Sequence, residues 1–305
     1  MKIAITGGTG FVGAHLVDLA LAGGHQVRAL TRRAQPERQG VTWIPGDLSA
    51  DAALLDLCAG AAAIIHVAGV VNAPDHAGFH TGNVGGTRAV LAAAERAGVA
   101  RFIQVSSLSA REPDLSLYGA SKARADQLVQ RSSRAWTIVR PPAVYGPGDM
   151  AMLDLYRLAR SGWALLPGKG RFSLIYVTDL AAALLALATV TTGVGQSFEI
   201  DDGTGGLGHG EMADLIGEAV GRTPRKVRLP TAALTVGAAL DTLRARLSDD
   251  LPTLSLDRAR YIAHPDWTAD VAPLADLGIW QPHVRPREGI ARTAAWYRSQ
   301  GLLRP

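Results

Sequence analysis

Two side chains able to exchange a proton, Tyr118 and Lys122, lie four positions apart in the segment LYGASKARAD, residues 117–126. The chain has only 6 Tyr and 4 Lys in 305 residues, so chance alone seldom produces this spacing. Residues i and i+4 share one face of an α-helix. An ammonium group beside a phenol favours the phenolate and lowers the phenol's pKa, which allows proton transfer near neutral pH. The spacing predicts an acid–base pair; the plainer alternative is a helix-cap tyrosine beside a solvated lysine.

A second segment that could bind a ligand is the glycine-rich stretch TGGTGFVG, residues 6–13. Gly8, Gly10 and Gly13 satisfy the pattern G-x-G-x-x-G, and Gly7 adds a second phase. Glycines allow a tight turn and close approach of the backbone to a pyrophosphate, while the helix N-terminus offers free N–H groups to the anion. The segment therefore predicts a dinucleotide site formed by Gly7, Gly10, Phe11, Val12 and Gly13.

The end of the second predicted strand indicates which dinucleotide binds. NAD-binding proteins usually have an acidic residue there, which holds the ribose hydroxyls. This chain has ALTRR at residues 29–33, with no carboxylate and with Arg32 and Arg33 available for a 2′-phosphate. Guanidinium groups match phosphate geometry and stay charged. We therefore expect NADP, with NAD as the alternative.

These residues need a scaffold, and the first half of the chain alternates strands with helices. This alternation predicts a parallel sheet with helices on both faces. The expected strands are residues 2–6, 26–30, 41–44, 63–68, 101–106 and 136–140, and the expected helices are 11–22, 51–58, about 80–97 and 118–131.

After residue 149 the alternation becomes less regular. We expect a dinucleotide-binding domain over residues 1–149 and a smaller, mainly substrate-binding lobe over 150–305, with about 172–200 returning to the first domain. Later strands are expected at 172–177 and 196–200, and later helices near 150–161, 179–190, 211–220, 231–247 and 286–299.

Several motifs together carry a resemblance to a known family. They are TGGTGFVG, GDL (46–48), HVAG (66–69), NVGGT (83–87), VSSLS (105–109), YGASK (118–122), RPPAVYGPGD (140–149) and YVTDLA (176–181). With these motifs the chain resembles the extended or atypical short-chain dehydrogenases and reductases, close to the dihydroflavonol-reductase and 3β-hydroxysteroid-dehydrogenase branch. The resemblance spans residues 1–181 and implies a Rossmann-type doubly wound sheet.

The resemblance also implies roles for particular residues. Tyr118 would be the general acid and base, Lys122 would also bind the nicotinamide ribose, and Ser107 would hold the substrate oxygen. Ser106 and Ser109 are weaker candidates for the role of Ser107. The resemblance further implies cofactor contacts from Asp47, Leu48, Val67, Ala68, Gly69, Pro141 and Val144, and a structural role for Asn83; at Gly69 extended members more often have Ala.

Three function classes remain open. The first is NADP(H)-dependent interconversion of a carbonyl and a secondary alcohol. The second is nucleotide-sugar epimerisation or dehydration, and the third is a cofactor-binding subunit or sensor without turnover. The arginine pair, the short loop between Ser107 and Tyr118, and the absence of an Arg-Asp-Phe stretch before YVTDLA favour the first class.

Composition excludes other classes. The single Cys58 cannot form an intrachain disulfide, and no His, Cys or carboxylate spacing indicates a metal site. The net charge of +4 is scattered, which argues against a nucleic-acid partner, and the longest apolar run is about half of a membrane span. We expect a cytoplasmic enzyme with a small-molecule substrate. The resemblance implies a homodimer, with Val90, Ala94 and Leu128 as its contact face.

Overall fold

The computed structural model describes residues 1–248 and 256–304, and contacts divide it into two compact units. Unit 1 comprises Met1–Pro141, Leu180–Ile200 and Val271–Gln281. Unit 2 comprises Pro142–Asp179, Asp201–Asp270 and Pro282–Pro305. The domain boundary that we placed after residue 149 stays a prediction; the first division by contacts falls at Pro141.

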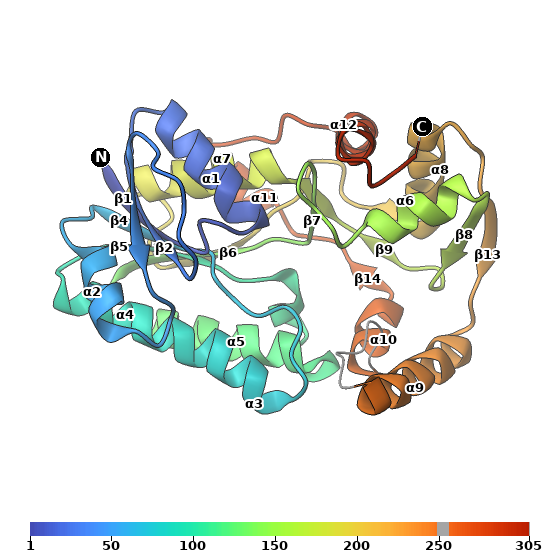
Figure 1. Ribbon diagram of the computed structural model, residues 1–305, viewed down its shortest axis with the longest axis horizontal. Helices are drawn as coiled ribbons and strands as arrows, with labels where there is room; N and C mark the ends of the chain where they lie inside the picture. Colours follow the sequence, from blue (N-terminus) through green and yellow to red (C-terminus); the bar gives the residue numbers. More distant parts are fainter. Residues whose placement is uncertain (249–255, 305) are drawn as a thin grey trace. The chain divides into compact units, whose positions relative to one another are not determined.

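Unit 1 contains a seven-stranded parallel sheet in the order β11-β6-β5-β4-β1-β2-β3 (Figure 1). All residues of β4 and β5 are buried, as is usual when helices cover both faces of a sheet. The order confirms the predicted doubly wound fold. The strands are β1 (Lys2–Thr6), β2 (Gln26–Thr31), β3 (Val41–Pro45), β4 (Ala63–His66), β5 (Arg101–Val105), β6 (Ala135–Arg140) and β11 (Gln196–Glu199).

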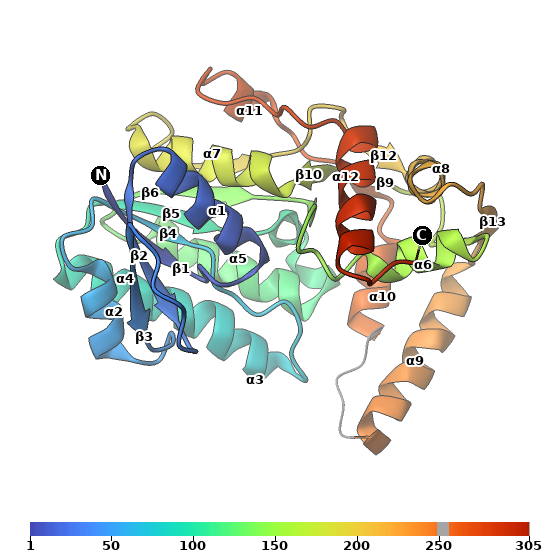
Figure 2. The same ribbon diagram turned by 45° about the horizontal axis from the view of Figure 1, so that its top comes forward.

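Helices flank this sheet on both sides (Figures 1 and 2). One side carries α1 (Phe11–Ala22), part of α7 (Val177–Thr189) and α11 (Ala272–Ala275). The other side carries α2 (Asp51–Cys58), α3 (His76–Phe79), the π-helix η1 (His80–Gly85), α4 (Gly86–Arg96) and α5 (Leu117–Gln130). Two 3₁₀ turns, η2 (Leu108–Arg111) and η3 (Pro113–Leu115), precede α5. The helix predicted near residues 80–97 is therefore a π-helical turn followed by an α-helix.

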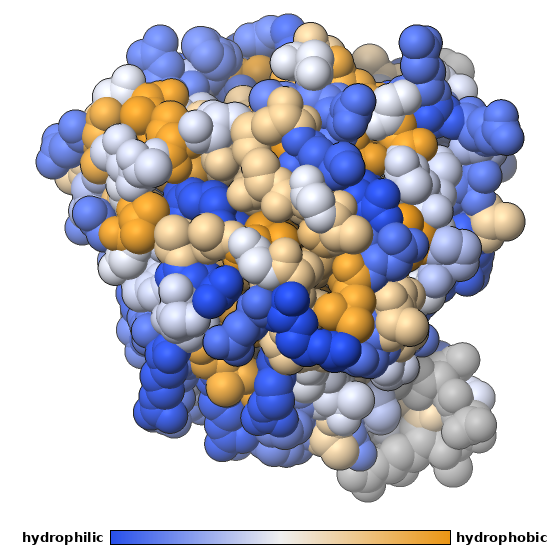
Figure 3. All heavy atoms as spheres, turned by 90° about the vertical axis from the view of Figure 1, so that its left-hand side faces the viewer, coloured by the Kyte–Doolittle hydropathy of each residue, from blue (hydrophilic) through white to orange (hydrophobic). Residues whose placement is uncertain are grey.

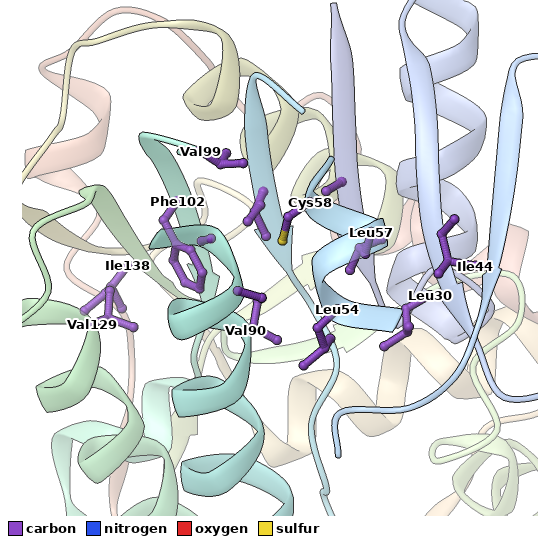
Figure 4. Packing of buried hydrophobic residues seen from close by; sticks show 14 residues of the cluster. Leu30, Ile44, Leu54, Leu57, Cys58, Val90, Val99, Phe102, Val129 and Ile138 are labelled. Atoms are coloured by element: carbon purple, nitrogen blue, oxygen red, sulfur yellow. The ribbon is translucent and has the colours of Figure 1, made fainter. Parts of the chain in front are cut away.

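The core between the sheet and α2, α4 and α5 includes Leu54, Val90, Phe102 and Ile138 (Figure 4). Val90 and Ala94 are fully buried in this core, so the prediction that they form a subunit contact is wrong. Their helical spacing reflects packing onto the chain's own sheet. Leu128 is half-buried.

Unit 2 is built from helices and short strand pairs. Its helices are α6 (Leu153–Arg160), α8 (His209–Val220), α9 (Thr231–Ser248), α10 (Leu256–Ala263) and α12 (Pro286–Ser299). Strand β7 (Ala143–Tyr145) pairs with β10 (Leu174–Tyr176), and β8 (Trp163–Leu166) pairs with β13 (Arg225–Arg228). Strand β9 (Arg171–Phe172) lies between β12 (Leu207–Gly208) and β14 (Asp266–Trp267).

The strand predicted over residues 172–177 is divided in the structure. Phe172 ends β9, residues 174–176 form β10, and Val177 already begins α7. The apolar run continues from a strand into a helix, and such a run has no period that marks the change.

No helix within residues 1–248 and 256–304 is long and apolar enough to cross a membrane. Figure 3 shows one face, on which hydrophobic and hydrophilic residues are interspersed. Scattered apolar surface of this kind is common on globular proteins.

Candidate active site

The glycine-rich turn between β1 and α1 has no room for side chains at two positions. A Cβ atom at Gly13 would lie 2.0 Å from the carbonyl oxygen of Gly7, and one at Gly7 would lie 2.9 Å from the backbone N of Ala68. Gly7 also has a φ of 72°, in the left-handed region that favours glycine. Helix α1 begins at Phe11 with no acidic residue in its first turn, so no side-chain carboxylate in that turn opposes its positive end. The turn fits a pyrophosphate.

The segment after β2 lines a surface hollow of about 950 Å³. Arg32 and Arg33 are exposed there. Trp43 also lines the hollow, and its Nε1 donates a hydrogen bond to the carbonyl of Pro36 at 3.1 Å. The hydroxyl of Thr31 donates to the carbonyl of Arg33 at 2.6 Å, which fixes the turn that carries the arginines. The hollow is large enough for a ribose phosphate, and its exposed guanidinium groups suit an anion.

The predicted adenine-side residues follow β3. Asp47 is exposed, and its carboxylate accepts hydrogen bonds from the backbone N and the hydroxyl of Ser49, at 2.8 and 2.6 Å. These bonds lower the pKa of Asp47. Leu48 is half-buried against Gly86, where a Cβ atom would lie 2.6 Å from Leu48 Cδ1.

Strand β4 ends at His66, two residues earlier than predicted, so Val67 and Ala68 lie in the loop after it. Thr6 Oγ1 accepts from the backbone N of Ala68 at 3.2 Å and lies 2.6 Å from His66 Nδ1. Burial lowers the pKa of His66 to about 3, so this imidazole is neutral and joins the ends of β1 and β4. The Gly-rich turn and the loop after β4 are thus held together.

Tyr118 and Ser107 come together at the C-terminal end of β5. Tyr118 lies in the first turn of α5, where it is half-buried and contacts Phe79 at 6.2 Å between ring centroids. Burial raises the pKa of Tyr118, and the nearby hydroxyl of Ser107 opposes that rise. The expected lowering by Lys122 is not among the causes in this structure. At neutral pH the phenol therefore holds its proton, as a proton donor requires.

Lys122 is buried one turn further along α5. Its side chain is 4% exposed, and Nζ donates to the carbonyl of Val105 at 2.7 Å. Burial lowers the pKa of Lys122 to about 8, while Asp126 acts in the opposite direction. The ammonium is held at the end of β5, within the same local site as Tyr118.

Asn83, in the π-helix η1, anchors the loop after β4. Its side chain accepts from the backbone N of Val70 at 2.7 Å, and donates to the carbonyl of Val70 and to Ser121 Oγ, both at 2.9 Å. Asn83 thus ties this loop to α5, as the resemblance implied. Beside it, a Cβ atom at Gly69 would lie 2.9 Å from Asn83 Oδ1 and 3.7 Å from Lys122 Nζ. Glycine at this position avoids a close contact with the side chain of Asn83.

Two residues next to the candidate catalytic group, Ser109 and Asp126, were not predicted to contact it. Ser109 is fully buried and donates from its hydroxyl to Ser107 Oγ at 2.9 Å. Asp126 is 1% exposed and accepts from Arg140 Nε at 3.0 Å. Asp126 lies four residues after Lys122, so helical spacing is a signal that would have placed it beside the lysine. The Ser106 hydroxyl has no hydrogen-bond partner within the described residues, whereas the Ser107 hydroxyl accepts from Ser109.

The remaining predicted cofactor residues fall in different units. Pro141 is the last residue of the first segment of unit 1, and its carbonyl accepts from the backbone N of Leu108 at 2.8 Å. This bond joins the ends of β5 and β6. Val144 lies in unit 2, where it pairs with Ile175 between β7 and β10. Within the described part of the chain, no group of three or more His, Cys, Asp and Glu is placed to hold a metal ion.

Comparison with known proteins identifies the family. The profile of the NAD dependent epimerase/dehydratase family matches residues 3–200. The chain is 38% identical to the ceramide reductase of Caulobacter vibrioides, over 99% of this chain and 96% of that protein. It is 32% identical to the 2-alkyl-3-oxoalkanoate reductase of Stenotrophomonas maltophilia, over 97% and 99%.

Solved structures agree on the fold. The structure of MoeE5 in complex with UDP-glucuronic acid and NAD superposes with a TM-score of 0.76, at 23% identity, over 98% of this chain and 100% of that one. This likeness confirms the Rossmann-type architecture. With the family profile and the two reductases, it shows that the chain belongs to the NAD dependent epimerase/dehydratase family.

Proposed function

We propose that this protein is an NADP(H)-dependent reductase that interconverts a ketone and a secondary alcohol, with Tyr118 as general acid and base. The observation that carries the proposal is the cluster of Ser107, Tyr118 and Lys122 at the C-terminal end of β5. Ligands of open parallel sheets bind at that edge. The two full-length relatives that are named as reductases support the same reaction class.

The residues present fit a nicotinamide dinucleotide. Gly7, Gly10, Phe11, Val12 and Gly13 would hold the pyrophosphate at the start of α1, where two glycines leave no room for a Cβ atom. Arg32 and Arg33 would hold a 2′-phosphate in the hollow after β2. Asp47, Leu48, Val67, Ala68 and Gly69 would line the remainder within unit 1, with Pro141 near the nicotinamide. When bound, this cofactor supplies or accepts a hydride.

The chain's own residues perform the proton transfer. The phenol of Tyr118 donates its proton to the carbonyl oxygen during reduction and takes it back during oxidation. The hydroxyl of Ser107 donates a hydrogen bond to the same oxygen. Lys122, whose ammonium group is held at the end of β5 by the carbonyl of Val105, would bind the nicotinamide ribose.

The relatives also support a substrate class. One is named for a ceramide and the other for a 2-alkyl-3-oxoalkanoate, and both molecules carry aliphatic chains. We infer that the ketone of the present substrate lies on an aliphatic lipid. Nucleotide-sugar epimerisation remains the competing reaction, because the family description includes epimerases and dehydratases.

One experiment separates these reactions. The purified protein is incubated with NADPH and either a 2-alkyl-3-oxoalkanoate, a long-chain ketone or a UDP-sugar. We expect loss of NADPH absorbance in proportion to alcohol formed, detected by mass spectrometry. Conversion of a UDP-sugar without net NADPH loss would favour the epimerase. Tight NADPH binding with no product from any compound would favour a non-catalytic role.

A further inference from the structure

We propose that unit 2 binds reversibly to the surface of an anionic phospholipid bilayer, through an apolar and cationic surface on the β8–β13 pair and α9. We call this the ribbon surface: Trp163 and Leu165 of β8, Arg222, Arg225 and Val227 on and before β13, and Val236 and Leu240 of α9. The inference rests on unit 2 alone and does not depend on the proposed reaction.

The two sides of the β8–β13 pair differ in their environment. Ala164 and Leu166 pack with Ala213 of α8, and Lys226 pairs with Asp214 of the same helix at 2.6 Å. This side is covered. Successive side chains of a strand point to opposite faces, so Trp163 and Leu165 lie on the other side.

That outer side presents large apolar side chains to solvent. Trp163 is 43% exposed and Leu165 is 47% exposed. The register pairs Trp163 with Arg225 and Leu165 with Val227, so these four residues share one face. An exposed tryptophan beside an exposed leucine is unusual on a water-facing strand, whereas tryptophan is enriched at membrane–water interfaces.

One arginine lies over the Trp163 ring, and a second lies beside the preceding residue. The guanidinium of Arg225 lies 5.6 Å from the centre of the Trp163 ring. Arg222 lies next to the preceding residue, because a Cβ atom at Gly162 would be 3.2 Å from Arg222 Nε. An aromatic ring flanked by guanidinium groups can enter the headgroup layer while the charges contact lipid phosphates.

Helix α9 follows β13 along the chain (Figures 1 and 2) and carries two exposed apolar side chains. Val236 is 60% exposed and Leu240 is 63% exposed, and their spacing of four places them on one helical face. Leu234 and Ala238 point elsewhere, since they are buried with Ala259 of α10. The exposed pair therefore forms an apolar stripe that its own helix partner does not cover.

The charge pattern decides between possible occupants. Residues 219–240 contain no Asp or Glu, and their cations on or beside the outer side are Arg222 and Arg225, since Lys226 pairs with Asp214 on the covered side. An isologous contact between two copies would bring these like charges together, and a neutral apolar partner would leave them unmatched. A sheet of anionic headgroups above acyl chains matches both the cations and the apolar side chains.

The test is sedimentation of the full-length protein with vesicles of phosphatidylcholine alone or mixed with phosphatidylglycerol. We expect binding to the anionic vesicles, weak binding to the neutral ones, and a decrease as salt rises. The variant Trp163→Ser/Leu165→Ser should bind about tenfold or more weakly, because each apolar side chain loses its burial in the bilayer. Arg222→Gln/Arg225→Gln should weaken binding to anionic vesicles by about tenfold or more, and Val236→Ser/Leu240→Ser should also bind more weakly.

Matched controls are Val194→Ser, another exposed apolar residue, and Arg88→Gln, an exposed cation on α4. Both should bind like the unchanged protein. Every variant is compared with the unchanged protein by melting temperature and circular dichroism, so that misfolding is recognised. If a double variant fails to fold, Leu165→Ser alone replaces it.

Three results would overturn the proposal. The first is no sedimentation with anionic vesicles at low salt. The second is that the ribbon-surface variants and the controls bind equally well to anionic vesicles. It would also count against the proposal if the protein bound a soluble polyanion such as heparin as tightly as the vesicles and the apolar substitutions had no effect. The third is a concentration-dependent dimer that Trp163→Ser/Leu165→Ser abolishes, which would make a second copy the occupant.

Discussion

Ser109 Oγ donates a hydrogen bond to Ser107 Oγ at 2.9 Å, and the backbone N of Ser109 approaches the same oxygen at 3.3 Å. Because Ser107 accepts both bonds, its own hydroxyl hydrogen is free to point toward Tyr118 or a substrate oxygen. We propose that Ser109 thereby positions Ser107.

Ser109→Ala should lower kcat by about fivefold or more, the equivalent of roughly one hydrogen bond, with little change in cofactor affinity. Ser109→Thr should restore most of this loss, because it retains the hydroxyl. Steady-state kinetics with NADPH and a reducible ketone provide the measurement, and Ser132→Ala is the control. Equal losses for the alanine and threonine variants would mean that Ser109 only fills space.

Lys122 should make the folding stability depend on pH. Burial lowers its pKa from 10.5 to about 8, so between these values the unfolded chain binds more protons than the folded one. Stability from this group therefore increases as pH rises from 8 to 10.5, and the buried charge reduces stability below 8. Lys122→Met should flatten that dependence. Urea unfolding at several pH values measures it, and an unchanged slope in the variant would refute the assignment.

Asp126 should tune the same lysine. Its carboxylate raises the pKa of Lys122, so Asp126→Asn should lower that pKa and move the alkaline limb of kcat/KM to lower pH. The charge of Asp126 also raises the pKa of Tyr118, and His66 near Lys122 is neutral above about pH 3. Asp18→Asn, which breaks an exposed ion pair with Arg38, is the matched control. If the alkaline limb of kcat/KM in the Asp126→Asn variant stays at the same pH, the pKa of Lys122 does not determine that limb.

Arg32 and Arg33 should select the cofactor. Replacing both with alanine should weaken NADPH binding by at least about tenfold and leave NADH binding nearly unchanged, because only NADPH carries the 2′-phosphate. Arg38→Ala is a close control, since Arg38 lines the same hollow but pairs with Asp18 at 2.6 Å. Titration calorimetry gives both affinities. Parallel losses for NADPH and NADH would contradict the assignment.

The sequence predicted the parts of the fold whose patterns are long. Strand β1 and helices α1 and α2 begin and end where expected, because glycines and apolar periods mark their limits. The strands β8 and β13 were missed, because four residues carry too little alternation to recognise. Val90 shows a further limit: an apolar helical face predicts burial but does not distinguish the chain's own sheet from a partner subunit.

The roles of the candidate site residues stay predictions, and the sequence foresaw only part of their arrangement. The spacing of Tyr118 and Lys122 predicted that they would be neighbours. The family resemblance predicted that Ser107 would belong to the same site. Their pKa values depend on burial by residues distant in sequence, so the raised pKa of Tyr118 was not foreseen. The bond from Ser109 to Ser107 depends on a 3₁₀ turn, which leaves no periodic signature in four residues.

Tyr118→Phe is the most direct test of the proposed chemistry. The substitution removes one hydroxyl and keeps the ring that contacts Phe79, so folding and NADPH binding should be preserved. General acid–base catalysis typically contributes about 10²–10⁴-fold, and kcat for ketone reduction should fall by that order. The measurement is single-turnover NADPH oxidation by the unchanged protein and the variant, each saturated with cofactor. A loss of about a hundredfold or more is the predicted result, and near-native turnover of the phenylalanine variant would contradict Tyr118 as the proton donor.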